Sequence, residues 1–98
     1  MSRYKIIPAA ARELEEAALN YEAASEGLGV DFVAEFDRAM ELVIAMPRAW
    51  LPVDVEYRRY LLRRFPYAVI YRLDGSLVIV TSVFHQHRRP DSWRTHIE

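Results

Sequence analysis

Two histidines and the arginines beside them, near the end of the chain, are the side chains best suited to chemistry. His85 and His87 are spaced i, i+2 at the end of an expected strand, so both should point to one side. An imidazole near its ordinary pKa can transfer protons at neutral pH. Arg88 and Arg89 follow directly and could stabilise negative charge on a phosphate. If the chain cleaves RNA without a metal ion, the candidate catalytic residues are therefore His85, His87 and Arg88.

The same histidines also have a simpler interpretation. His85 would then be a partly buried strand residue, and His87 would be a solvated one. A metal site with two histidine ligands is disfavoured, because Asp91 is the only evident third ligand nearby. The sequence therefore predicts neither a metal ion nor another cofactor.

Arginines also mark the strand expected at 57–64. Alternation along that strand would place Arg58 and Arg64 on one face, with Arg59 and Arg63 on the other. Both faces cannot serve one site, so one pair should flank an open surface while the other reaches past the helices to water. Arginine suits bidentate binding of phosphate or carboxylate. The residues expected to bind a target or an antagonist protein are Arg58, Arg63, Arg64, Arg72 and Arg89.

Charge is divided unevenly along the chain, although its net charge is only -1. Residues 1–50 carry five basic and nine acidic side chains, a balance of -4. Residues 51–98 carry eight arginines and five acidic side chains, a balance of +3. Lys5 is the only lysine among the 13 basic residues. The C-terminal half is therefore the part expected to attract anionic partners.

The 98 residues suffice for one domain, expected to span 1–98. The absence of cysteine excludes disulfides and thiolate metal sites. No apolar run approaches the length of a membrane span, and the first residues do not form a signal peptide. A soluble, cytoplasmic protein is expected.

Two helices are expected after a short strand at 4–7. Pro8 suits the first turn of a helix, and apolar residues then recur with helical period as far as Leu28. Gly27 and Gly29 are expected to stop this helix, and a second helix should begin near Asp31 and end at Pro47. The short connection predicts an antiparallel helical hairpin.

Three further strands are expected at 57–64, 67–73 and 77–85, after a loop at 48–56. Asp74-Gly75 is a turn signal that joins the last two strands as a hairpin. The chain should end in a loop or a short helical turn at 90–93. The predicted fold class is α+β, in the order β-α-α-β-β-β. The helical hairpin would pack on one face of a small, largely antiparallel four-stranded sheet, and the other face would stay open near the arginines and histidines.

Several sequence segments carry a resemblance to a known superfamily. They are YKIIPAA at 4–10, FPYAVIYR at 65–72, the Asp74-Gly75 turn and VFHQHRRP at 83–90. In this combination and order of elements, the chain resembles the RelE/ParE superfamily of bacterial toxins, over nearly its whole length. The resemblance implies a growth-arresting toxin of a type II toxin–antitoxin system, associated with plasmid stabilisation and held inactive in a complex with a cognate antitoxin.

The resemblance leaves two targets open. ParE-like members poison DNA gyrase, whereas RelE-like members cut mRNA on the ribosome. The near-neutral charge and the single lysine favour the ParE-like branch, because a nuclease that works within the ribosome gains from a net-basic surface. The histidine pair favours the RelE-like alternative.

Overall fold

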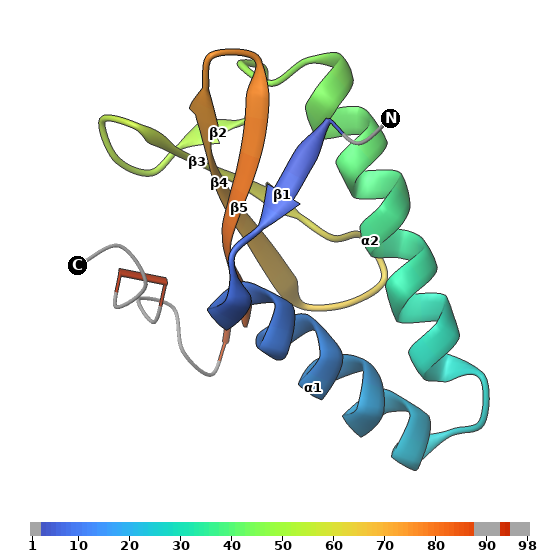
Figure 1. Ribbon diagram of the computed structural model, residues 1–98. Coiled ribbons are helices and arrows are strands. Elements are labelled where there is room, and N and C mark those ends of the chain that lie inside the picture. Colours follow the sequence, from blue (N-terminus) through green and yellow to red (C-terminus); the bar gives the residue numbers. More distant parts are fainter. Residues whose placement is uncertain (1–2, 88–92, 95–98) are drawn as a thin grey trace.

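The computed structural model describes residues 3–87 and 93–94, in which a helical hairpin packs against one face of a sheet (Figure 1). The elements in chain order are β1 (Tyr4–Ile6), α1 (Pro8–Ala24), α2 (Leu28–Ala45), β2 (Leu51–Pro52), β3 (Tyr57–Leu61), β4 (Tyr67–Asp74) and β5 (Leu77–His85). The α+β class and the helical hairpin are therefore confirmed. None of the described helices is long and apolar enough to cross a membrane.

The sheet of the described residues has five strands rather than the four expected, in the order β1-β5-β4-β3-β2. β1 runs parallel to β5, and the remaining neighbours are antiparallel. The added strand β2 lies in the segment expected to be a loop, where Leu51 pairs with Arg59 and Pro52 with Arg58. A strand of two residues, one of which is proline, is too short to show an alternating pattern in the sequence. Pro52 is compatible with a strand only because β2 lies at the edge of the sheet.

The hairpin of β4 and β5 forms the centre of the sheet. Its two-residue turn is Gly75-Ser76, one position later than expected, and Gly75 supplies the positive φ of 63°. The register shifts between Ile70 and Tyr71, where Thr81 of β5 has no register partner and forms a β-bulge. β1 pairs only with residues 78–80 of β5, so the later part of β5 lies beside α1 instead.

The helical hairpin differs from the expectation at its connection. Gly27, at φ 86°, is the N-cap of α2, and Leu28 begins that helix instead of ending α1. Gly29 lies inside α2, where a Cβ would be only 2.5 Å from the carbonyl oxygen of Ala18. Gly29 therefore allows the two helices to approach closely and does not stop a helix.

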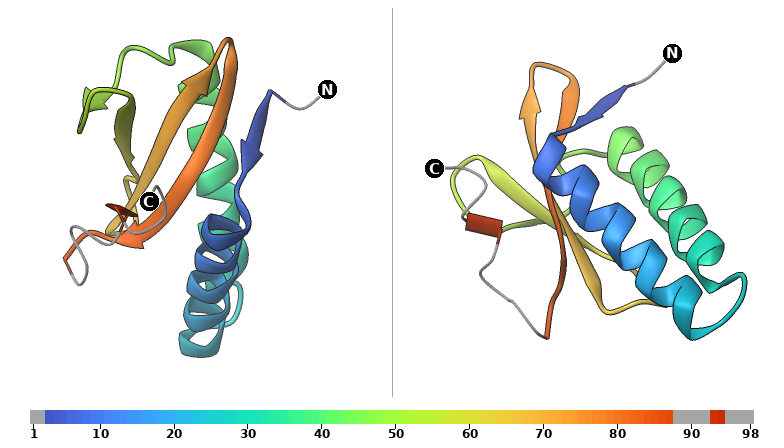
Figure 2. Two further views of the ribbon diagram at one scale, coloured as in Figure 1. Left: turned by 60° about the vertical axis from the view of Figure 1, so that its left-hand side comes forward. Right: turned by 60° about the horizontal axis from the view of Figure 1, so that its bottom comes forward.

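Both faces of the sheet are covered, although unequally (Figure 2). The main core lies between the helices and the sheet, with Phe32, Phe36 and Tyr71 almost fully buried. On the other face, Trp93 is only 4% exposed and packs in a smaller cluster with Ala68, Ile70 and Phe84. The expectation of an open second face is wrong at this point, because a residue far along the chain covers it. Within the turn expected at 90–93 only Trp93 is described, and it forms a 3₁₀ turn with Arg94.

Candidate functional site

Arg58 lies beside Tyr71 on the helix-facing side of the sheet, and both side chains hold the segment that follows α2. One guanidinium nitrogen of Arg58 donates hydrogen bonds to the carbonyl oxygens of Arg48, at 3.1 Å, and Trp50, at 2.8 Å. The Tyr71 hydroxyl donates to the carbonyl oxygen of Pro47. Burial raises the pKa of Tyr71 to about 12, although the nearby Arg58 charge acts in the opposite direction. Arg58 therefore has a structural role that its sequence pattern did not indicate.

Arg63 and Arg64 are exposed in the loop between β3 and β4 and do not lie on a strand. β3 ends at Leu61, three residues before the expected end at 64. The expected division of these arginines between two faces therefore does not apply. Arg64 pairs with exposed Asp31 at 3.6 Å, and its guanidinium lies 5.4 Å from the centre of the Phe65 ring.

The backbone of this loop is held by the carboxylate of Glu35, a residue that the sequence analysis did not distinguish. Glu35 of α2 is only 7% exposed, and its carboxylate accepts hydrogen bonds from the backbone N–H groups of Arg63 and Arg64. Beside it the Phe65 ring packs on Phe32, with ring centres 5.1 Å apart. The main chain of the loop is thus hydrogen-bonded to α2, while both arginine side chains remain exposed at the surface.

Arg72 and Arg59 lie on the sheet face that points away from the helices. Arg72 pairs in register with Tyr57, whose ring contacts Trp93 of the smaller cluster. Arg72 is half-buried and forms no ion pair within the described residues. The Arg59 Nε is buried and has no hydrogen-bond acceptor in the same part of the chain. Within the described ranges, neither Arg59 nor Arg72 is paired with a carboxylate.

A pocket of about 330 Å³ lies where β3 begins and β4 ends; we call it the sheet-end pocket. Its lining combines three arginines, two carboxylates and two tyrosines with apolar and backbone atoms. The lining residues are Arg48, Pro52, Asp54, Val55, Glu56, Tyr57, Arg58, Tyr71, Arg72, Leu73 and Gly75. Two predicted binding residues, Arg58 and Arg72, are thus among the lining residues, although their side chains belong to opposite faces of the sheet. Arg48 also lines the pocket and was not among the predictions.

The two histidines lie at the opposite end of the hairpin of β4 and β5. His85 is half-buried and pairs in register with Tyr67, whose ring centre is 5.3 Å from that of His85. His87 is exposed, and its backbone N–H donates to Nδ1 of His85 at 3.2 Å. The simpler interpretation of both residues therefore matches their burial.

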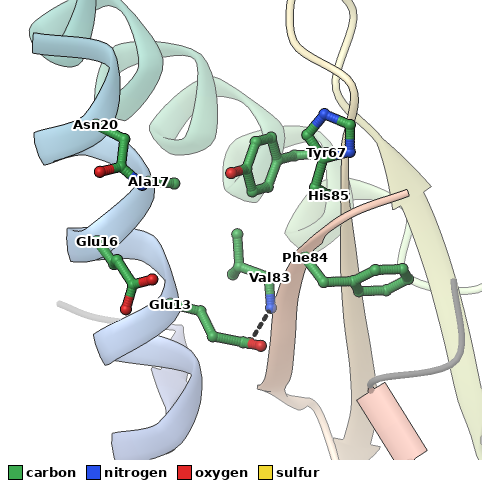
Figure 3. Close-up of a pocket in the computed structure, with 8 residues that line it drawn as sticks. All are labelled: Glu13, Glu16, Ala17, Asn20, Tyr67, Val83, Phe84 and His85. Atoms are coloured by element: carbon green, nitrogen blue, oxygen red, sulfur yellow. Dashed lines mark hydrogen bonds between the residues drawn. The ribbon is translucent and has the colours of Figure 1, made fainter. Parts of the chain in front are cut away.

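His85 and Tyr67 also line a small pocket of about 140 Å³ between α1 and β5, shown in Figure 3. Glu13 of α1 closes one side, where its carboxylate accepts hydrogen bonds from Ser82 Oγ at 3.1 Å and the Val83 N–H at 2.8 Å. Because β1 ends before this part of β5, Glu13 takes the place of a neighbouring strand there. Its hydrogen bonds indicate that Glu13 is a structural residue.

Among the described residues, Arg72 does not meet His85. Tyr67, the register partner of His85, precedes Arg72 by five residues on β4, which corresponds to roughly 17 Å along a strand. The side chains of His85 and Arg72 also lie on opposite faces of the sheet. Tyr67, the register partner of His85, packs with the main core, whereas Arg72 is paired with Tyr57 of the smaller cluster. His85 and Arg72 cannot act on one phosphate group.

Arg88 and Arg89 lie outside the described residues, as does Asp91. Within the described residues, no group of three histidine, aspartate or glutamate side chains could hold a metal ion.

This geometry defines a small α+β protein in which, among the described residues, the arginines of the sheet-end pocket lie apart from His85 and His87. A family model described as "ParE toxin of type II toxin-antitoxin system, parDE" matches residues 4–90. The chain therefore belongs to the ParE toxin family and is the toxin component of a type II toxin–antitoxin system. This confirms the resemblance to the RelE/ParE superfamily.

The fold also matches a solved structure titled "Chromosomal ParDE TA system from P. aeruginosa". The TM-score is 0.70 at 18% sequence identity, and the match covers 87% of this chain and 96% of the other. At this identity the comparison shows a shared fold. No curated protein matches the chain with significance.

Proposed function

We propose that this toxin arrests growth by poisoning DNA gyrase through direct contact, and that a cognate antitoxin neutralises it. The observation that carries the proposal is the match of the ParE toxin family to residues 4–90.

The loop that carries Arg63 and Arg64 is the proposed contact with the target. Its backbone is held by Glu35, and its guanidinium groups are exposed, so little side-chain surface must be rearranged on binding. Arginine is enriched among the residues that dominate the affinity of protein interfaces. Arg89 remains a proposed binding residue outside the described residues.

The alternative is a RelE-like endoribonuclease that cuts mRNA on the ribosome. It would rely on His85, His87 and Arg88. In the described residues Nδ1 of His85 accepts the His87 N–H, so a proton transfer by this ring would have to use its Nε2.

Two measurements on the purified chain test the proposal. Added to gyrase, it should inhibit supercoiling of a relaxed plasmid, and added to translating ribosomes it should leave mRNA intact. Growth arrest with unaffected gyrase and codon-specific mRNA cuts would refute the gyrase proposal and establish the alternative.

A paired substitution locates the contact. Arg63→Ala with Arg64→Ala should abolish gyrase inhibition and change the unfolding free energy by under about 0.5 kcal/mol each, because both side chains are exposed. Arg38→Ala, at an exposed position on α2, is the matched control and should retain inhibition.

A further inference from the structure

Charge is separated between the two layers of the fold. The helical hairpin, residues 8–45, carries nine acidic and two basic side chains, a balance of -7. The rest of the chain carries 11 basic and five acidic side chains, a balance of +6. The net charge of -1 therefore conceals an acidic helical layer and a basic remainder. Because the hairpin covers one face of the sheet, the opposite face is the one that can present positive charge (Figure 2).

The strand register gathers basic residues on this opposite face. Lys5 of β1 pairs with Ile79 of β5, which in turn pairs with Arg72 of β4. The residues directly before and after Lys5 and Arg72 pack in the main core, so these two side chains lie on the face away from the helices. Arg59 of β3 pairs with Ile70 of the smaller cluster and therefore lies on the same face.

Arg3 extends this face beyond the end of β1. Its carbonyl oxygen accepts the Val78 N–H at 3.3 Å, so the backbone before β1 still follows β5. Arg3 is exposed and lies two residues before Lys5, and alternation places both side chains on one face. We call the surface formed by Arg3, Lys5, Arg59 and Arg72 the basic sheet face.

The described part of the chain leaves the basic sheet face largely unneutralised. None of its four cations forms an ion pair with a described carboxylate. Among the described strand residues of this face, the carboxylate is Asp74, two residues after Arg72 at the end of β4. The buried Nε of Arg59 has no acceptor in the same part of the chain. A face with four cations and one carboxylate favours an anion from outside.

The surface between the cations favours a polyanion over an acidic protein segment. Ile79, between Lys5 and Arg72, is only 8% exposed, so this part of the face lacks the exposed apolar surface found at the core of a protein interface. Lys5 and Arg72 are two strands apart, which corresponds to about 10 Å between their Cα atoms. Charges spread over three strands suit several phosphates of one backbone better than one small anion, and phosphate contacts supply most non-specific binding to nucleic acids.

We propose that the basic sheet face binds the phosphate backbone of duplex DNA. The choice of duplex DNA rests on the proposed function, because gyrase acts on duplex DNA. The toxin then contacts gyrase through the loop of Arg63 and Arg64 and the DNA through the basic sheet face. The acidic hairpin, on the other side of the sheet, is repelled by the phosphates and orients the molecule with this face toward the DNA.

Fluorescence anisotropy of a labelled DNA duplex, titrated with the full chain at several salt concentrations, tests the proposal. The parent chain should bind saturably at low salt. Lys5→Gln with Arg72→Gln should weaken binding by about 10- to 100-fold, because hydrogen bonds to charged groups are lost. The slope of log K against log salt should fall by about 0.9 for each lost phosphate contact, hence by about 2 in this double variant.

The matched control is Arg12→Gln with Arg38→Gln, two exposed positions on the helical hairpin. It changes the net charge by the same amount and should bind DNA like the parent chain. Both double variants should melt like the parent, since none of the four side chains forms a hydrogen bond or an ion pair within the described residues.

Absence of saturable binding to the duplex, or equal losses in the two double variants, would overturn the proposal. Tighter binding to single-stranded RNA than to the duplex would overturn it in favour of an RNA ligand. Tighter binding to polyglutamate would overturn it in favour of an acidic protein.

The binding assay uses the chain without gyrase, so this proposal and the proposed function can fail separately. If gyrase is inhibited but the chain binds no duplex DNA, the proposed function stands and the DNA-binding face is overturned. If the duplex is bound with the expected dependence on Lys5 and Arg72 while gyrase is unaffected, the DNA-binding face stands and the proposed function fails.

Discussion

Single residues that hold the backbone explain more of this site than the residues that look reactive. Glu35 was not distinguished by the sequence, because it lies among other acidic residues of an amphipathic helix. In the fold it is buried and accepts the N–H groups of two successive loop residues. Conversely, His87 belongs to a conspicuous pair but is exposed.

Replacing Glu35 should loosen the loop between β3 and β4. Glu35→Ala leaves two N–H groups without their acceptor, so we expect the unfolding free energy to fall by about 1–3 kcal/mol. Amide hydrogen exchange at Arg63 and Arg64 should become faster than in the parent chain. Unchanged exchange at both amides, measured by NMR, would show that the carboxylate does not hold the loop.

Replacing His87 separates the two proposed targets. In a gyrase poison, His87→Ala should keep most of the growth arrest, because contact area and arginines dominate such binding. In a ribonuclease, loss of an acid or base group should reduce cleavage by about 10²- to 10⁴-fold. Growth assays together with primer extension on cellular mRNA distinguish the outcomes. Codon-specific cuts that vanish in the variant would contradict the gyrase proposal.

The elements of the helical hairpin are joined by a connection that one side chain organises. Glu22, near the end of α1, accepts the N–H of Gly27 at 2.8 Å and of Gly29 at 3.0 Å. These are among the N–H groups at the start of α2 that lack an acceptor within the helix. Glu22 therefore caps the helix that follows its own, a role usually filled by the N-cap side chain that Gly27 lacks.

Stability should depend on pH through Glu22. Hydrogen bonds from the Gly27 and Gly29 N–H groups lower the pKa of Glu22 below its ordinary value. A lowered pKa in the folded state contributes stability above the pKa of the unfolded chain, about 4.3. This stability is lost as the pH falls through the folded-state value. Glu22→Ala should therefore lower the melting temperature at neutral pH, and the difference should narrow below about pH 4.3. A difference that stays constant across this range in thermal melts would exclude the cap.

At the scale of the whole molecule, two apolar clusters pack on opposite faces of one sheet, whose strands β3 and β4 also carry Arg58, Arg59 and Arg72. Trp93 is separated by long stretches of sequence from Tyr57 and Ile70, yet it packs on the sheet face opposite the helices. Its neighbour Arg94 pairs with Asp54 of the sheet-end pocket. Trp93 and Arg94 thus contact the same face of the sheet that carries Arg72.

Removing Trp93 should therefore destabilise the whole domain. Trp93→Ala leaves a cavity in the smaller cluster, and we expect the unfolding free energy to fall by about 3–5 kcal/mol, as for other large buried aromatic residues. Denaturant unfolding followed by circular dichroism measures the change. Arg94→Ala is the matched control at the next position, and it should cost little because its ion pair is exposed. A loss under about 1 kcal/mol for Trp93→Ala would show that the cluster is not part of the cooperative core.

The sequence by itself determined the α+β class, the helical hairpin and the three longer strands after it. Those features follow from local periodicity, turn residues and apolar runs, which act over a few neighbouring positions. The segments FPYAVIYR and VFHQHRRP were also sufficient to indicate the toxin superfamily. The ends of elements were less well predicted. The strand expected at 57–64 ends at Leu61, because the N–H groups of Arg63 and Arg64 donate to Glu35 and not to a neighbouring strand.

Only the tertiary structure decided which charged residues share a site. Alternation along a strand could not show that Arg58 binds the carbonyl oxygens of residues after α2, or that Arg48 lies beside it. The register of β4 and β5 places Arg72 and His85 at opposite ends of the hairpin, which the sequence pattern could not show. The strand β2, the position of Gly29 within α2 and the cover provided by Trp93 depend equally on contacts between distant segments. Such contacts are set by packing, which a local pattern does not encode.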